Sequence, residues 1–311
     1  MRSESPSISR RCATEPTTGG RLASAGAFHL DGPTRRLDGR INAFRRDIAD
    51  VALAGTLFAP HYAAPMPRVA SGSAMIRTAP GDDAEAASQI LPGEEFAVLD
   101  VVAGWAWGYS KHDHYVGYVA ADSLALPFEP GFRVSVREAL LFSGPSIKSP
   151  VIGTLPFGAR LAGEAEEGFV ALATGFVHDR HVAPLGERAD DAVTVAEVFL
   201  GMPYLWGGRG ADGIDCSGLV QVALGATGIA APRDTDMQRE ALGEALAETD
   251  RLRRGDIVNF PGHIGLMVDD FRLIHANAYW MSVVIEPLAD VVARLAPNHD
   301  RPILSRRRII S

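Results

Sequence analysis

The chain has 311 residues, with 30 Lys and Arg against 38 Asp and Glu, and therefore a formal net charge of -8. This length predicts two or three domains, and a composition of 47% hydrophobic and 22% charged residues excludes a wholly disordered chain. The acidic excess argues against a nucleic-acid partner, because a nucleic-acid-binding surface presents a basic patch.

Cysteine content and hydropathy narrow the class of protein further. The two cysteines, Cys12 and Cys216, are too few to staple a chain of this length, so packed cores must stabilise it. No run of about 18 apolar residues occurs, so we expect no transmembrane helix. The polar N-terminal segment lacks the apolar core of a signal peptide. We therefore expect a cytoplasmic protein; a misassigned start codon would leave a periplasmic or secreted location open.

The first third of the chain changes texture twice. Residues 1–36 are rich in Ser, Thr, Gly and Arg and are predicted to form a disordered arm. Residues 37–66 are mixed and are predicted to be a docking segment, either a short helix or an extended stretch. From residue 67, short β-type runs alternate with clusters of Gly, Pro and Asp, which predicts a small β-barrel or sandwich.

A weak internal repeat follows. Residues 90–108 are echoed by 154–172, and residues 115–124 are echoed by 173–182. Two copies predict a duplicated small domain over 67–127 and 128–188, because a solenoid needs at least three units. In each copy an apolar strand, a turn of the Gly-Trp type and a strand of the Gly-Tyr-Val type precede a one-turn helix. This order resembles that of bacterial SH3-like domains.

Residues 189–311 are predicted to form an α+β domain. Helical periodicity appears in three stretches, 189–202, 216–228 and 234–246. The β-type runs come afterwards, together with a short helix over 288–295 and a final strand over 301–310. Helices followed by meandering strands are typical of the α+β class.

Cys216 is the first candidate for chemistry. It lies between Asp215 and Ser217, where a loop containing two glycines becomes an apolar helix. A thiol in the first turn of a helix faces unpaired N–H groups and the positive end of the dipole, which predicts a lowered pKa. A buried inert cysteine is the alternative, but polar neighbours on both sides favour a reactive thiol.

Two histidines supply the base that such a thiol requires. His263 begins a predicted strand after a Pro-Gly turn, and His275 lies in the next strand. Antiparallel pairing of these strands would set the imidazoles side by side. Cys216 and the two histidines would also suit zinc, but the chain contains no CxxC or HExxH pattern. We therefore expect no metal and no cofactor.

Three strings carry a family resemblance: MPYLWGGRGADGIDCSGLVQ, then PRDTDMQ, then RRGDIVNFPGHIGLMVDDFRLIHAN. Together they resemble the NlpC-type peptidases, papain-like thiol enzymes that cut the stem peptides of bacterial peptidoglycan. The resemblance covers about residues 190–311. It implies that Cys216 is the nucleophile, His263 the base and His275 the third, orienting residue.

Two SH3-like domains before such a catalytic domain resemble the γ-D-glutamyl-L-diamino-acid endopeptidases of the dipeptidyl peptidase VI type. The resemblance implies hydrolysis of murein peptides with a free N-terminal L-Ala, release of L-Ala-D-Glu, and a role in murein recycling or turnover. It places Tyr115 and Asp234 at the substrate ammonium, with Thr235 where the family usually has Ser. Other residues implied to contact substrate are Tyr204, Trp206, Asp215 and Ser217.

Two rival interpretations remain at this stage. The same core serves thiol acyltransferases, which would need an apolar cleft, and SH3-like domains also serve as cell-wall binding modules. Asp234 has a structural alternative as a helix N-cap, and Tyr115 as an ordinary strand aromatic. The sequence leaves several properties open: diaminopimelate or Lys in the substrate, stem length, oligomeric state, compartment and the role of residues 1–36.

Overall fold

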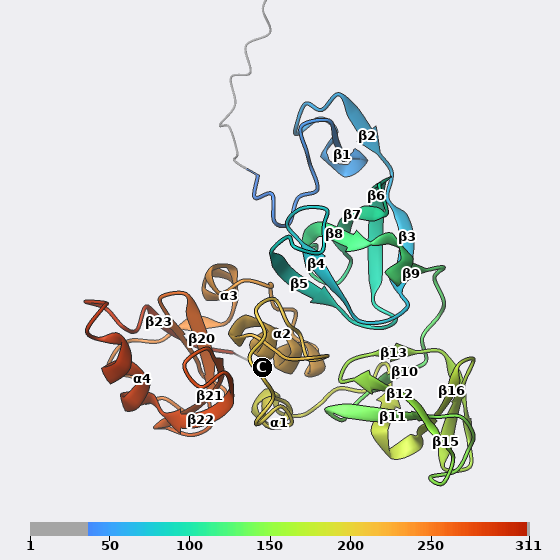
Figure 1. Ribbon diagram of the computed structural model, residues 1–311. Coiled ribbons are helices and arrows are strands. Elements are labelled where there is room, and N and C mark those ends of the chain that lie inside the picture. The colour runs from blue at the N-terminus through green and yellow to red at the C-terminus, as the bar shows by residue number, and fades with distance from the viewer. Residues whose placement is uncertain (1–36, 310–311) are drawn as a thin grey trace, which may run out of the picture. The chain divides into compact units, whose positions relative to one another are not determined.

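The computed structural model describes residues 37–309 (Figure 1). The predicted disordered arm, with Cys12, lies outside them. Strands dominate the first two-thirds of the described chain and all four of its α-helices follow residue 190, which confirms the α+β class. None of the helices described is long and apolar enough to cross a bilayer.

Residues 37–66 contact the first β-domain and consist mostly of turns and loops, with two short strands. They contain β1 (Ile48–Asp50), the one-turn helix η1 (Val51–Leu53) and β2 (His61–Ala63), with β1 and β2 parallel. The guanidinium of Arg45 lies 4.5 Å from the ring centre of Trp107 and forms an ion pair with Asp100. The backbone N–H of Val116 donates to the carbonyl of Arg40 at 2.8 Å. These contacts attach the segment to the strands that follow it.

The first β-domain is one antiparallel sheet of seven strands in the order β5-β4-β8-β7-β6-β3-β9. Alternate residues such as Ile76, Phe96 and Val119 are fully buried and form its core. The elements are β3 (Met66–Ala70), β4 (Ala74–Arg77), β5 (Ala86–Ile90), β6 (Glu95–Val102), β7 (Trp105–Ser110), β8 (Val116–Ala120), η2 (Ala121–Ser123) and β9 (Leu124–Ala125).

The second β-domain has two antiparallel sheets, ordered β13-β10-β17 and β12-β11-β16-β15-β14. Its elements are β10 (Phe132–Val134), β11 (Glu138–Phe142), β12 (Val151–Pro156), β13 (Arg160–Leu161), β14 (Gly163–Glu166), β15 (Phe169–Leu172), β16 (Gly175–His178), η3 (Asp179–His181) and β17 (Val182–Pro184). In both β-domains a strand enters a one-turn helix and then a short strand, β8-η2-β9 and β16-η3-β17. This shared order explains the echo between the two sequences.

The last domain is a six-stranded antiparallel sheet with helices, in the strand order β18-β23-β19-β20-β21-β22. Its helices are α1 (Ala192–Glu197), α2 (Cys216–Ala226), α3 (Thr235–Ala241) and α4 (Leu288–Leu295). Its strands are β18 (Glu244–Ala245), β19 (Ile257–Phe260), β20 (His263–Met267), β21 (Arg272–Asn277), β22 (Ser282–Pro287) and β23 (Ser305–Arg308). The third predicted helix is shorter than expected, because Gly243 adopts a positive φ and β18 begins directly after it.

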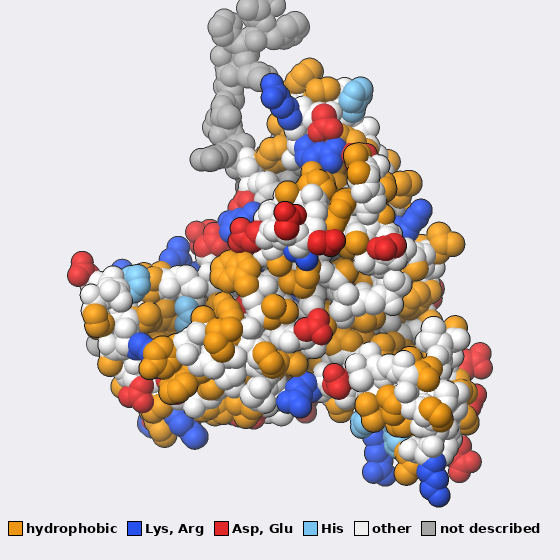
Figure 2. Space-filling model, in the orientation of Figure 1, with side chains coloured by type: hydrophobic (Ala, Val, Ile, Leu, Met, Phe, Trp, Pro, Cys, Tyr) orange, Lys and Arg blue, Asp and Glu red, His pale blue; other side chains and the backbone are white. Residues whose placement is uncertain are grey.

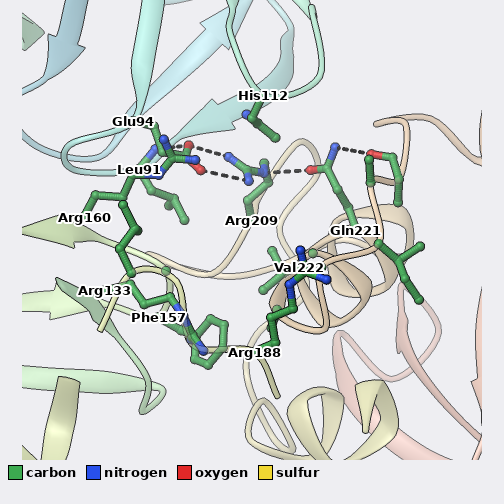
Figure 3. Close-up of a pocket in the computed structure, with 18 of the residues that line it drawn as sticks. Leu91, Glu94, His112, Arg133, Phe157, Arg160, Arg188, Arg209, Gln221 and Val222 are labelled. Atoms are coloured by element: carbon green, nitrogen blue, oxygen red, sulfur yellow. Dashed lines mark hydrogen bonds and ion pairs between the residues drawn. The ribbon is translucent and has the colours of Figure 1, made fainter. Parts of the chain in front are cut away.

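Helix α2 is buried on both sides. Leu219 and Ala223 pack with Ile264 and Ile274 of the sheet. On the side of α2 that faces the first β-domain, the contacts are polar and are made by the side chain of Gln221. It accepts from Nε of Arg209 at 2.8 Å, and the same guanidinium forms a buried ion pair with Glu94, as Figure 3 shows. A buried guanidinium needs such partners, so this row ties the first β-domain to the helix that begins at Cys216.

Candidate active site

The loop before α2 fixes where Cys216 lies. Asp215 is the N-cap of the helix, and its carboxylate accepts from the N–H of Gly218 at 2.7 Å and of Gly207 at 2.9 Å. Gly207 has a φ of 76°, a conformation that side chains rarely adopt, which explains the glycine after Trp206. The thiol therefore stands at the first residue of a capped helix.

Arg233 holds this N-cap from the other side. It is 1% exposed and forms a bidentate pair with Asp215, at 2.6 and 2.9 Å. It also donates to the hydroxyls of Ser217 at 2.8 Å and of Ser88, in the first β-domain, at 3.0 Å. Arg233 was not among the predicted site residues, although its place directly before Asp234 in the PRDTDMQ string was a usable signal.

The two histidines lie on neighbouring strands, as predicted. Strands β20 and β21 are antiparallel, with Leu266 opposite Ile274. This register puts His263 and His275 on the same face, and Nε2 of His263 lies 2.7 Å from Nδ1 of His275. His275 is fully buried.

Glu286 extends this chain and was also missed. Its Oε1 lies 2.8 Å from Nε2 of His275, and its carboxylate pairs with Arg294. An acidic residue in the apolar strand SVVIEP was the available signal. Because a carboxylate only accepts, Nε2 of His275 carries its proton and Nδ1 accepts from Nε2–H of His263. Nδ1 of His263 is then left unprotonated, as a base requires.

The surroundings of Cys216 favour the neutral thiol, the opposite direction from the lowered pKa that the sequence predicts. Burial and the Asp215 carboxylate raise the pKa of Cys216 to about 12, although Arg233 and the backbone of Ile264 act in the opposite direction. Burial, followed by His275, lowers the pKa of His263 to about 3. The helix terminus is outweighed because the thiol is 6% exposed and has a carboxylate beside it.

A second group of polar residues lies at the start of α3. Asp234 occupies the N-cap position, but its side chain makes no capping hydrogen bond. It accepts instead from the phenol of Tyr115 at 3.2 Å and from Nη1 of Arg40 at 2.8 Å. Burial raises the pKa values of both Asp234 and Tyr115. The structure therefore brings Tyr115 and Asp234 together, and adds Arg40, which the sequence analysis did not single out.

The remaining predicted residues differ in their surroundings. Tyr204 packs against the core cluster that contains Cys216, and burial, followed by Cys216, raises the pKa of its phenol. Trp206 is 59% exposed. Thr235 begins α3, and its side chain forms no hydrogen bond within residues 37–309. Along the same residues, no group of three or more Cys, His, Asp or Glu is placed to hold a metal ion.

Two family models match the chain. Residues 76–124 match the model of the bacterial dipeptidyl-peptidase Sh3 domain, and residues 201–293 match the NlpC/P60 family. The first match lies in the first β-domain and contains Tyr115. The second contains Cys216, His263 and His275.

Curated relatives agree with these matches. The chain is 32% identical to a γ-D-glutamyl-L-lysine dipeptidyl-peptidase of Bacillus cereus, over 65% of this chain and 70% of that protein. It is 28% identical to dipeptidyl-peptidase 6 of Lysinibacillus sphaericus, over 54% of this chain and 61% of that protein. It is 30% identical to a γ-D-glutamyl-L-lysine dipeptidyl-peptidase of Bacillus subtilis, over 41% of this chain and 47% of that protein.

A solved structure shares the fold. An NlpC/P60 family protein of Bacillus cereus superimposes with a TM-score of 0.66, at 21% identity, over 79% of this chain and 100% of that one. The arrangement of β-domain and α+β domain is therefore common to both chains.

The half-buried His263 and the buried His275 make stability depend on pH. The pKa values of His263 and His275 are lowered to about 3 and about 4, from 6.5. Below pH 6.5 the unfolded chain binds protons that the folded chain does not, so stability is retained above that pH and lost as the pH falls towards 4. Each histidine contributes a slope of up to about 1.4 kcal/mol per pH unit.

Urea unfolding between about pH 7 and about pH 4.5 measures this slope. In the variant His263→Gln, the slope of the unfolding free energy against pH should be smaller by the contribution of one histidine. The variant His61→Gln, at an exposed position on β2, should keep the full slope. An identical slope in wild type and His263→Gln would show that the imidazole is not held neutral by burial.

Proposed function

The chain belongs to the NlpC/P60 family, and on that premise we propose that it hydrolyses the bond between γ-D-Glu and an L-diamino acid in murein peptides with a free N-terminal L-Ala. The products are L-Ala-D-Glu and the diamino acid or the peptide that it begins. A peptidase of this type is supported by relatives named γ-D-glutamyl-L-lysine dipeptidyl-peptidase and dipeptidyl-peptidase 6. Its role would be the recycling or turnover of murein peptides.

One feature supports the reaction type: a thiol at a helix start packs against the two strands that carry a chain of imidazoles ending on a carboxylate. The backbone of Ile264 contacts the thiol of Cys216, and the adjacent residue is His263. We assign Cys216 as nucleophile, His263 as base and His275 as the residue that orients it. An activated thiol with an oriented base is the arrangement that acyl transfer requires.

In the first step, the sulfur of Cys216 attacks the γ-carbonyl carbon while Nδ1 of His263 takes the thiol proton. The positive charge that forms on His263 is stabilised through His275 by the Glu286 carboxylate. The oxyanion forms near unpaired backbone N–H groups at the start of α2, where the dipole favours negative charge. Neutral partners suit this step, because the proton moves as the bond forms.

In the second step, the imidazolium of His263 gives its proton to the departing amine, and the carbon–nitrogen bond breaks. The γ-carboxyl group of D-Glu is left as a thioester on Cys216. Water then attacks the thioester while His263 takes a proton from it. That proton returns to the sulfur as the thioester opens, which restores the neutral pair.

The pair of Asp234 and Tyr115 supports selection of a free amine. Asp234 is partly buried, with a side chain 24% exposed, and its carboxylate already accepts from the Tyr115 phenol. An ammonium bound there gains a charge-assisted hydrogen bond, whereas an acetylated amine brings no charge and too much bulk.

Peptide hydrolysis tests this proposal. L-Ala-γ-D-Glu-diaminopimelate and its Lys counterpart should each be compared with their N-acetylated twins, with products identified by mass spectrometry. We expect L-Ala-D-Glu from the unblocked peptides alone, and no product from Cys216→Ala. Equal cleavage of the acetylated peptides would contradict the ammonium site. Cleavage of neither peptide, or activity retained by Cys216→Ala, would contradict the proposed reaction.

Replacing Glu286 tests the proton chain. Glu286→Gln removes the charge that orients His275 and stabilises the imidazolium, so kcat should fall by about 100-fold, the lower end of what a positioned base contributes. KM should change little, because Glu286 contacts no substrate. The matched control is Glu244→Gln, on the exposed strand β18 of the same sheet. An unchanged kcat, with the variant folded by circular dichroism, would leave Glu286 a structural residue only.

A further inference from the structure

We propose that in the free enzyme the guanidinium of Arg40 pairs with the Asp234 carboxylate at the position that the substrate ammonium later takes. When a free amine binds, the guanidinium moves away from Asp234 and keeps its contacts with Asp38 and Asp236. Arg40 would then set the affinity for the N-terminal residue of the substrate. This inference deepens the proposed function and rests on it.

The first support is the position of the guanidinium. Its Nη1 lies 2.8 Å from Oδ2 of Asp234, the carboxylate that the Tyr115 phenol also contacts. An ammonium group bound by the same two residues would need to donate to the same carboxylate. A carboxylate can accept several hydrogen bonds, but two cations held against it repel each other, so the guanidinium and the substrate amine compete for Asp234.

The second support is that Arg40 still has two carboxylate partners, Asp38 and Asp236, when it does not contact Asp234. Its Nη1 and Nη2 donate to the two carboxylate oxygens of Asp236, at 2.9 and 2.8 Å. Its Nη2 and Nε also reach Asp38, at 2.8 and 3.2 Å. Acidic and basic side chains gather beside α3 on the face seen in Figure 2. Leaving Asp234 therefore does not leave the guanidinium unpaired.

The third support is the difference in burial between the two sides of the ion pair. The Arg40 side chain is 38% exposed, and ion pairs at this exposure contribute little to stability. Asp234 is less exposed, and burial raises its pKa, so its carboxylate gains from having a cation at all times. An exchange of one cation for another satisfies Asp234 before and after binding.

The fourth support is how Arg40 is anchored. Its carbonyl accepts from the N–H of Val116, the residue after Tyr115, and its own N–H donates to Asp38 at 2.9 Å. The backbone is thus fixed beside Tyr115. Only the side chain has to move for the exchange to occur.

The test is calorimetric binding of L-Ala-γ-D-Glu to the Cys216→Ala enzyme, with and without Arg40→Met. Removal of the competing cation should tighten Kd by about two- to fivefold, the range that an exposed ion pair corresponds to. In the Asp234→Asn background, Arg40→Met should leave Kd unchanged. The matched control is Arg46→Met, an exposed arginine of the same segment that forms no ion pair within residues 37–309.

Weaker binding in Arg40→Met would show that Arg40 positions Asp234 instead of competing at it. An unchanged Kd, or no binding by either protein, would equally overturn the proposal. Binding of N-acetyl-L-Ala-γ-D-Glu to the Cys216→Ala enzyme tests the ammonium site separately. If the acetylated peptide binds as tightly as the free one, the enzyme does not select a free amine and the ammonium site is wrong. If the acetylated peptide does not bind and Arg40→Met leaves the Kd of the free peptide unchanged, only the proposed role of Arg40 is contradicted.

Discussion

The buried ion pair between Arg233 and Asp215 connects Cys216, the first β-domain and the loop that carries Asp234. It fixes the N-cap of α2 and so the place of Cys216, and through Ser88 it reaches the first β-domain. The residue after Arg233 is Asp234, so the same loop also positions the acidic group beside Tyr115. A guanidinium that is 1% exposed cannot remain there without its carboxylate. Cys216, the first β-domain and Asp234 are therefore coupled through one side chain.

This coupling has an electrostatic consequence. The Asp215 carboxylate that caps the helix also raises the pKa of the thiol beside it, and burial acts in the same direction. The same carboxylate that fixes the N-cap before Cys216 thus disfavours the thiolate. Activation depends on the histidine chain, in which the Glu286 carboxylate fixes the tautomers of His275 and, through it, His263. In the proposed reaction, charge would develop only when the sulfur attacks a carbonyl carbon, at a thiol that is 6% exposed.

The features that could be predicted are those that depend on residues close together in the sequence. The helix start at Cys216 follows from a glycine-containing loop before an apolar helix, and the pairing of the two histidine strands follows from their alternation and short turn. Arg233 and Arg40 escaped because they have remote partners: Arg40 and Asp234 are 194 residues apart, and Arg233 and Ser88 are 145 apart. Glu286 is only 11 residues from His275, but the pairing of their two strands, which brings them together, is a property of the fold. The predicted direction of the thiol pKa was wrong for a related reason. A helix terminus is visible in a sequence, whereas burial of its first residue is a property of the fold.

The ultraviolet absorbance of the thiolate, titrated in wild type and Cys216→Ala, tests the central claim most directly. Subtracting the variant removes the signal of Cys12 and of the tyrosines. With the pKa of Cys216 raised to about 12, the difference spectrum should show no thiolate from about pH 5 to about pH 9. A thiolate band that appears at or below about pH 7 would show a resting ion pair with His263, and would contradict activation by proton transfer during attack.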